Sequence, residues 1–438
     1  MALRLRVVSA DLPSFLQPRP TEPSDSSDSF DRHNKPRLRR SIILSALFDK
    51  YPQITNFTKP PSPFQYCDLV DLYSSIHDGD MIQFLANAWS KWKEMGPNWD
   101  SDNCHPDWRE MKKDADDEND GNVPPLIPQH SAFRRNDGTE RPSNNVMGAM
   151  GYYCTDNCTP IVASLVSELQ EDAAVICSAV NYAFLNVEGG SRDKCVVYAV
   201  TTHPGHHTSR DCFGGYCYLN NAALCARLMQ RRLEAGSSVS NNGRVVANHG
   251  EDTNDEQDAK KRKKNCRVAI IDIDYHCGNG TASIFYKDPD VFFTSIHCDP
   301  EIEYPWNHGY EDQIGSGEGE GMTLHVPLAP GATWEETYKP ALEKVMEAIT
   351  KFGPAAMVVS IGLDTYDGDA VAVNRGGFKL KGRDYYEMGL HMGRYMVGKE
   401  SIPVVFVQEG GYKMDTVGDA AADVVGGFAY GAGVGQES

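Results

Sequence analysis

Residues 267–276 read RVAIIDIDYH, and this stretch decides the fold. Its unbroken apolar run predicts a strand buried on both faces, as in a parallel sheet that helices cover. Side chains two positions apart on an extended chain share a face, so Asp272, Asp274 and His276 point the same way. Two carboxylates and an imidazole on one face are able to chelate a metal ion.

Similar apolar runs alternate with amphipathic segments over the rest of the chain. Strands are expected at residues 3–9, 195–201, 267–273, 291–297, 356–361 and 403–408. Helices are expected at residues 37–51, 81–95, 160–183, 218–234, 333–352 and 383–398. This alternation predicts an α/β fold with a central, mostly parallel sheet flanked by helices.

Residues able to do chemistry stand just after four of these strands. They are His206 and His207 of HPGHH, the group Asp272, Asp274 and His276, Asp364 of GLDTYDGD, and Tyr412 of QEGGY. In an open parallel sheet, ligands bind beyond the carboxyl ends of the strands, so the four sets are expected to converge. Asp364 is then the natural third metal ligand after Asp274 and His276. The alternative is a buried polar network without a cation, which would cost several kcal/mol for each carboxylate.

The two adjacent histidines occupy a tight strand-to-helix turn. Beside a metal ion, His206 and His207 suit proton transfer, whereas adjacent histidines taken alone are more often surface residues. Tyr412 follows two glycines that allow close backbone approach, and its hydroxyl is able to donate to a developing oxyanion. Taken alone, Tyr412 would be a core or rim tyrosine.

Charge and composition narrow the partners. The chain has 61 acidic and 42 basic residues among 438, a formal net charge of −19. This charge argues against a nucleic-acid surface and favours cationic or neutral ligands. We find neither a membrane span nor a signal peptide, so the expected compartment is the cytoplasm. The KKRKK run at 260–264 keeps a nuclear location open. The 12 scattered cysteines are expected to be reduced thiols.

Two polar segments interrupt the pattern. Residues 96–150 form a long loop that carries the acidic run DADDEND at 114–120, and they are either disordered or functional. Residues 235–265 lack hydrophobic periodicity and are interpreted as a disordered insertion within a single domain spanning residues 1–438.

The ordered motifs resemble those of the zinc-dependent deacetylase family, which includes histone deacetylases and acetylpolyamine amidohydrolases. They are HPGHH (203–207), FGGYCYLNNAA (213–223), DIDYHCGNGT (272–281), FFTSIHCDP (292–300), GLDTYDGD (362–369) and QEGGY (408–412). Residues 32–42, 74–96 and 150–154 resemble the acetylpolyamine amidohydrolase branch in particular. The resemblance implies the three-layer, arginase-like fold of that family.

The resemblance also assigns roles to single residues. It implies Asp274, His276 and Asp364 as ligands of one zinc ion per chain, with Tyr412 polarising the substrate carbonyl. It also implies hydrogen bonds from His206 to Asp272 and from His207 to Asn279. Tyr216 and Tyr304 match the residues that line the family's substrate channel, with Gly214 and Gly215 beside it. The family's potassium ions would lie at Asp272, Asp274, His276, Ser295 and Ile296, and at Phe285, Asp288 and Val291.

The implied reaction is zinc-dependent hydrolysis of an N-acetyl amide, with His207 and His206 moving protons. Three functions stay open: an amidohydrolase for acetylated polyamines or similar small amines, a protein lysine deacetylase, and a non-catalytic scaffold. In the acetylpolyamine branch, the loop corresponding to residues 96–150 builds a homodimer interface and narrows the channel, so a homodimer is expected here. Met147 stands where that branch carries an acidic residue. The candidate replacements are Glu301 and Glu303 or the acidic run at 114–120, and the alternative is that these are ordinary solvent-exposed charges.

Overall fold

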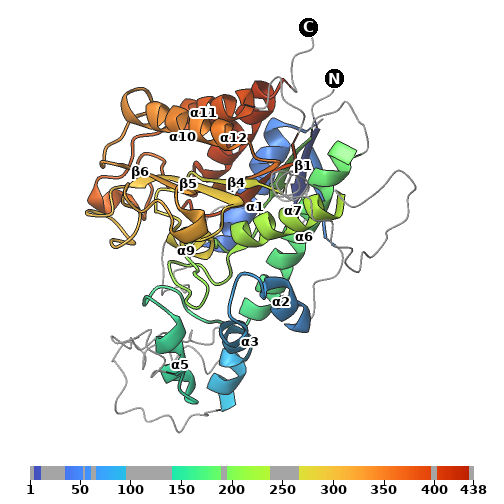
Figure 1. Ribbon diagram of the computed structural model, residues 1–438, viewed down its shortest axis with the longest axis vertical. Coiled ribbons are helices and arrows are strands. Elements are labelled where there is room, and N and C mark those ends of the chain that lie inside the picture. Colours follow the sequence, from blue (N-terminus) through green and yellow to red (C-terminus); the bar gives the residue numbers. More distant parts are fainter. Residues whose placement is uncertain are drawn as a thin grey trace.

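A computed structural model gives the fold of the chain (Figure 1). It describes residues 4–10, 35–52, 55–60, 66–94, 141–188, 195–236, 266–395 and 402–433. Within these residues, eight strands form one sheet in the order β2-β1-β3-β8-β7-β4-β5-β6, and every neighbouring pair is parallel. The strands are β1 (Arg4–Val8), β2 (Thr55–Thr58), β3 (Cys195–Ala199), β4 (Val268–Asp272), β5 (Val291–Cys298), β6 (Thr323–Leu328), β7 (Ala356–Ile361) and β8 (Val404–Gln408).

Helices cover both faces of the sheet, which makes a three-layer α/β fold (Figure 1). One core cluster joins the sheet to α1 (Pro36–Lys50), α10 (Lys339–Phe352), α11 (Gly382–Arg394) and α12 (Val417–Gly431). The other joins it to α2 (Tyr66–Tyr73), α3 (Gly79–Glu94), α5 (Val146–Tyr153), α6 (Leu165–Glu188), α7 (Asn221–Gly236) and α9 (Asn279–Phe285). The predicted fold class is confirmed.

Burial explains why the central strands are continuously apolar. Every residue of β4, β5, β7 and β8 is buried, because helices pack on both sides of these strands. Strand register then aligns their ends. Asp272, the last residue of β4, lies opposite Ser295 of β5 and Ser360 of β7. The loops that follow these strands therefore leave the sheet at one edge.

Some elements differ from the sequence-based expectations. The expected helix at 160–183 begins at Leu165 and runs to Glu188. The expected helix at 333–352 begins with a π-helical turn, Trp334–Tyr338, before α10. The loop expected at 96–150 ends in helix α5. Most of that loop, including the acidic run, lies outside the described residues, as does the insertion from 237 to 265 with its basic run.

Among the described residues, no helix is both long and apolar enough to cross a membrane.

Candidate active site

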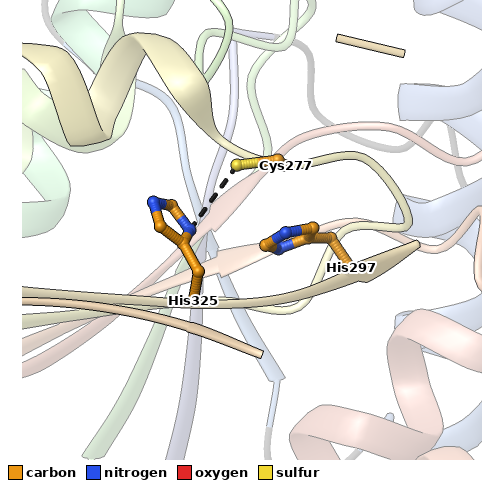
Figure 2. A group of neighbouring side chains, drawn as sticks. All are labelled: Cys277, His297 and His325. Carbon is orange, nitrogen blue, oxygen red and sulfur yellow. Dashed lines mark hydrogen bonds between the residues drawn. The ribbon is translucent and has the colours of Figure 1, made fainter. Parts of the chain in front are cut away.

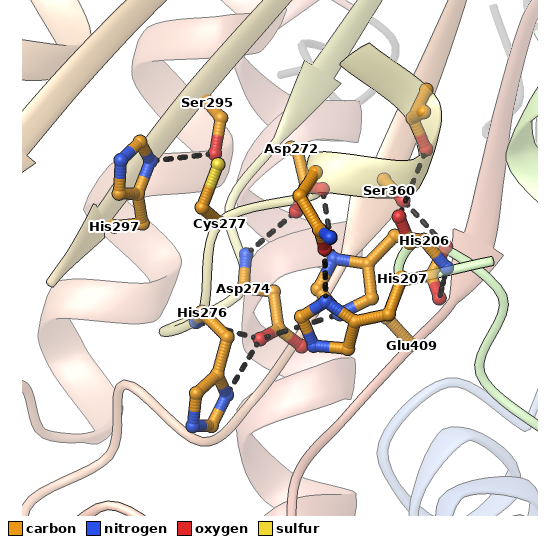
Figure 3. Close-up of polar contacts among 12 residues, drawn as sticks. His206, His207, Asp272, Asp274, His276, Cys277, Ser295, His297, Ser360 and Glu409 are labelled. Carbon is orange, nitrogen blue, oxygen red and sulfur yellow. Dashed lines mark hydrogen bonds and ion pairs between the residues drawn. The ribbon is translucent and has the colours of Figure 1, made fainter. Parts of the chain in front are cut away.

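The loops after β4 and β7 bring together a buried group of two aspartates and a histidine. Nδ1 of His276 lies 3.3 Å from Oδ1 of Asp274 and 3.1 Å from Oδ2 of Asp364. All three side chains are buried, and one ligand atom from each lies within 4.8 Å of the others. Figure 3 shows Asp274 and His276 beside the two histidines of the HPGHH loop. The structure thus places the three expected metal ligands together.

The donor chemistry of this group fits a zinc ion. Burial and the charge of Asp274 raise the pKa of Asp364 to about 7, because nearby negative charges disfavour a second one. A divalent cation would remove that penalty, and two carboxylate oxygens with one imidazole nitrogen are ligands that zinc accepts while keeping a position open. Glycine makes room for the group: a Cβ on Gly362 would lie 2.0 Å from Oδ2 of Asp274.

His206 and His207 lie side by side at the edge of this group, with ring centroids 4.0 Å apart. Nδ1 of His206 lies 2.9 Å from Oδ2 of Asp272, and Nδ1 of His207 donates to Oδ1 of Asn279 at 2.8 Å. Both partners are those that the family resemblance implies. Each hydrogen bond is made by Nδ1 and orients the imidazole ring, so Nε2 is the nitrogen that does not contact Asp272 or Asn279.

The two histidines have opposite proton affinities. Burial opposes a charge on His206, but the carboxylates of Asp274 and Asp272 outweigh it and raise the pKa of His206 to about 10. Burial lowers the pKa of His207 well below its usual value, and the charges of His206 and His276 lower it further. His207 is therefore neutral at neutral pH and has a lone pair that accepts a proton.

Two tyrosines and a glycine lie close to His207 and Tyr412. The ring of Tyr304 lies 4.8 Å from that of His207, and the ring of Tyr216 lies 5.6 Å from that of Tyr412. Burial raises the pKa of Tyr412 well above its usual value, so its hydroxyl remains protonated and able to donate. Gly215 has a φ of +59°, and a Cβ there would lie 2.5 Å from the His207 ring. Only glycine fits at this close approach.

Sequence reasoning missed Glu409, a fully buried carboxyl group in the QEGGY motif. It accepts hydrogen bonds from the backbone amides of Gly205 at 2.6 Å and His206 at 3.2 Å, and from the Ser360 hydroxyl at 2.5 Å. Figure 3 shows Glu409 and Ser360 beside the histidine pair. Glu409 therefore fixes the backbone of the HPGHH turn. Its position directly after an apolar strand is the sequence feature that could have identified it as a site residue.

A second missed residue is His203, the first histidine of HPGHH. Its Nε2 lies 3.1 Å from Oε2 of Glu168, and its Nδ1 lies 3.2 Å from Oδ2 of Asp172. The two carboxylates belong to α6, and Asp172 also accepts from the backbone amides of Thr202 and His203. These contacts fasten the histidine turn to α6.

The two expected potassium positions have different surroundings. Ser295 lies beside Asp272 in the β4–β5 pairing, and Ile296 follows Ser295 in β5. At the other position, Asp288 donates its backbone amide to the Phe285 carbonyl at 2.9 Å. The Asp288 carboxylate is paired with Arg227 at 2.6 Å, and Val291 begins β5. Arg227 thus neutralises the charge of the Asp288 carboxylate.

The acidic residues considered for substrate binding have their own contacts. Glu303 is buried, accepts from the backbone amide of Tyr304 at 2.9 Å and lies 3.5 Å from Arg375. Glu301 is exposed and accepts from the Tyr310 hydroxyl at 2.8 Å. Met147 is a buried residue of α5. Of these three positions, Glu301 alone presents an exposed negative charge.

The chain thus has a parallel α/β sheet, with a group able to hold a metal ion and a pair of histidines in the loops that follow its strands. A model of the histone deacetylase domain matches residues 35–240 and 255–428, so the chain belongs to the histone deacetylase family and is a hydrolase of the deacetylase class.

Similar proteins in the family include acetylpolyamine amidohydrolases and histone deacetylases. Acetylpolyamine amidohydrolase 1 of Pseudomonas aeruginosa is 32% identical over 353 residues, covering 81% of each chain. Acetylpolyamine amidohydrolase of Mycoplana ramosa is 31% identical over 356 residues, covering 81% of this chain and 82% of the relative. Histone deacetylase 10 of rice (Oryza sativa) is 31% identical over 232 residues, or 53% of this chain and 44% of the relative.

A solved structure shares the fold. The acetylpolyamine aminohydrolase from Burkholderia pseudomallei superposes with a TM-score of 0.68 at 22% identity. The match covers 98% of this chain and 99% of that one.

Proposed function

We propose that the protein hydrolyses the amide bond of N-acetylated small amines, above all acetylated polyamines, and releases acetate and the free amine. One observation carries the proposal: the buried Asp274–His276–Asp364 group lies beside a histidine, His207, that is neutral and oriented to accept a proton. That combination suits hydrolysis, in which a water molecule must lose a proton as it attacks a carbonyl.

Asp274, His276 and Asp364 would hold a zinc ion, which supplies Lewis-acid polarisation of the amide carbonyl and acidifies the attacking water. His207 accepts the proton of that water at Nε2, because Nδ1 is occupied by its hydrogen bond to Asn279. The hydroxyl of Tyr412 donates to the oxyanion as the carbonyl becomes tetrahedral. The C–N bond then breaks, and the proton held on His207 passes to the leaving amine.

His206 has a different part in this scheme. The hydrogen bond between Nδ1 of His206 and Asp272 holds this ring in place, and the neighbouring carboxylates raise the pKa of His206 above its usual value. The positive charge beside His207 keeps that ring a weak base, which lets it return the proton readily to the amine.

The proposed substrate class is supported by the relatives and by charge. The two amidohydrolases named above match four fifths of the chain, whereas the rice histone deacetylase matches about half of it. A net charge of −19 favours a cationic amine over an anionic ligand. Tyr216, Tyr304 and Gly215 would form the substrate channel, because they lie close to Tyr412 and His207.

A comparison of substrates tests the proposal. We expect kcat/KM to be higher for N-acetylputrescine-type amides than for acetyl-lysine peptides with zinc-loaded full-length protein. A preference of ten-fold or more for peptides would instead establish a protein lysine deacetylase. Absence of turnover on both classes, with zinc bound, would leave a non-catalytic scaffold.

We also propose potassium binding near Ser295 and a homodimer. The potassium proposal is supported by the position of Ser295 beside Asp272, and it predicts that turnover responds to K⁺ but less to Na⁺. The homodimer proposal depends on residues 95–140, which lie outside the described part of the chain. Sedimentation velocity of the full chain tests it.

A further inference from the structure

A second cluster of metal-ligating side chains lies beside the active site, made of Cys277, His297 and His325 (Figure 2). Three segments contribute to it. Cys277 is in the loop after β4, His297 is in β5 and His325 is in β6. Ser295 of β5 lies opposite His325 in the parallel pairing, and side chains two apart share a face. The register of β5 and β6 therefore directs both histidines to the same side.

The three side chains are close enough to share one ion. Sγ of Cys277 lies 3.7 Å from Nδ1 of His325, and the rings of His297 and His325 have centroids 5.4 Å apart. One ligand atom from each residue lies within 4.8 Å of the others. All three are buried, with His297 fully so and Cys277 exposed by 1%. Figure 2 shows the thiol directed toward the His325 ring.

Neighbouring groups orient the His297 ring. Nε2 of His297 donates to the carbonyl oxygen of Gly309 at 2.9 Å, which leaves the lone pair on Nδ1. The hydroxyl of Ser295 lies 2.8 Å from Nδ1 and donates to this lone pair. A backbone carbonyl on the far nitrogen is the usual support of a metal-binding histidine, and the hydroxyl is able to turn away when an ion takes the lone pair.

The second histidine is also available as a ligand. Burial, with smaller contributions from His297 and His308, lowers the pKa of His325 to about 3. The His325 imidazole is therefore neutral at physiological pH. One thiolate and two neutral imidazoles form a donor set that suits zinc, with its tetrahedral geometry and its preference for sulfur and nitrogen.

We propose that Cys277, His297 and His325 form a second zinc site, separate from the Asp274–His276–Asp364 group. Binding would release the thiol proton of Cys277 and form three bonds from the protein to the ion, leaving one position for water. Because Cys277 follows His276 directly in the chain, such an ion would tie the active-site loop to β5 and β6. The proposal does not depend on the substrate of the enzyme.

Cobalt replacement distinguishes the two sites in the full-length protein. A thiolate bound to Co²⁺ gives a charge-transfer absorption in the near ultraviolet, and the Asp274–His276–Asp364 group contains no sulfur. We expect the cobalt-loaded protein to show this absorption and the zinc-loaded protein to hold two zinc ions per chain. If the wild-type protein held only one zinc ion per chain and its cobalt form lacked the thiolate absorption, the proposal would be overturned.

Variants then locate the sulfur. Cys277→Ser and His325→Asn should each abolish the thiolate absorption and lose one zinc equivalent, while retaining the other. Cys298→Ser is the matched control, because Cys298 is a buried thiol of β5 outside the cluster, and it should keep both. Circular dichroism verifies that each variant is folded.

One alternative source of thiolate needs its own variant. Among the described residues, Cys217 also lies in a potential ligand group, with His206 and Glu409. An absorption that survives Cys277→Ser and disappears in Cys217→Ser would overturn the proposal. Persistence in Cys217→Ser, with loss in Cys277→Ser or His325→Asn, would support it.

Discussion

Burial, together with the positive charge of His206, lowers the pKa of His207, so its imidazole is neutral and its lone pair is available. In the proposed mechanism, replacing His207 removes the base that accepts the water proton. We expect His207→Ala to lower kcat by about 10²–10⁴-fold, the usual contribution of general acid–base catalysis. Zinc content by elemental analysis should be unchanged, because His207 is not a metal ligand. Full activity of this variant would contradict the assigned role.

The Tyr412 hydroxyl is a separate test of transition-state stabilisation. Tyr412→Phe keeps the ring that packs near Tyr216 but removes the hydroxyl that we propose donates to the oxyanion. We expect kcat to fall by about 10²–10³-fold with little change in KM, the effect of losing one oxyanion donor. Tyr430→Phe is the control, since Tyr430 is an exposed residue of α12. Equal losses in both variants would exclude a specific role for Tyr412.

His203 predicts a pH dependence of stability. Burial opposes its charge, but the hydrogen bonds to Asp172 and Glu168 dominate and raise the pKa of His203 to about 9 from 6.5. A raised folded-state pKa stabilises the protein fully below pH 6.5, and this contribution is lost as the pH rises through 9.

The test compares His203→Gln with the wild type across this pH range. We expect a loss of about 3 kcal/mol in the free energy of unfolding near pH 6, as for a broken buried ion pair, and a smaller loss above pH 9. Urea denaturation at each pH measures it. A loss that is the same at both pH values would show that His203 acts through packing alone.

At the scale of elements, the sequence predicted the central strands well and the peripheral ones poorly. β4, β5, β7 and β8 are apolar runs because helices cover them on both faces, and this pattern is visible without a structure. β2 (TNFT) is short and polar, and β6 (TLHVPL) contains a histidine and a proline. Their pairing with neighbouring strands, which no local pattern encodes, makes them strands.

The same distinction applies to the active site. The ligand and base residues follow recognisable strands, so their convergence could be predicted from parallel topology. Glu409 and His203 act through backbone amides and helix α6 respectively, and those contacts depend on how loops pack across the sheet. The Cys277–His297–His325 cluster was not predicted from the sequence for a related reason. Its members come from three segments, and one of these, β6, was not predicted as a strand.

The junction after β7 provides a test at this scale. Gly362 directly follows β7, and a Cβ there would lie 2.0 Å from Oδ2 of Asp274. Gly362→Ala should therefore displace a proposed zinc ligand and weaken zinc affinity by about 10-fold or more, as supporting residues of metal sites do. Competition with a chelator measures the affinity. Gly382→Ala is the control, because a Cβ on Gly382 would meet only Oδ2 of Asp423, at 3.7 Å. Normal zinc affinity in both variants would contradict the prediction.

At the scale of the whole molecule, the net charge of −19 is the dominant electrostatic feature. A negative field attracts cationic substrates, and salt screens that attraction beyond a Debye length of about 8 Å at physiological ionic strength. We expect kcat/KM for a cationic acetylamine to fall as NaCl increases, while a neutral acetylamine of equal length is little affected. Equal salt dependence for both substrates would exclude steering by charge.

The order of the strands has a consequence for how the protein is made. β8, the last described strand to leave the ribosome, sits in the interior of the sheet between β3 and β7. Until it is synthesised, β2-β1-β3 and β7-β4-β5-β6 have no strand to join them, and each half exposes an unpaired edge that invites wrong association. The same late segment carries Glu409 and Tyr412. Joining the halves and completing the catalytic centre are thus a single event, and a nascent chain released before it should be both inactive and prone to aggregate.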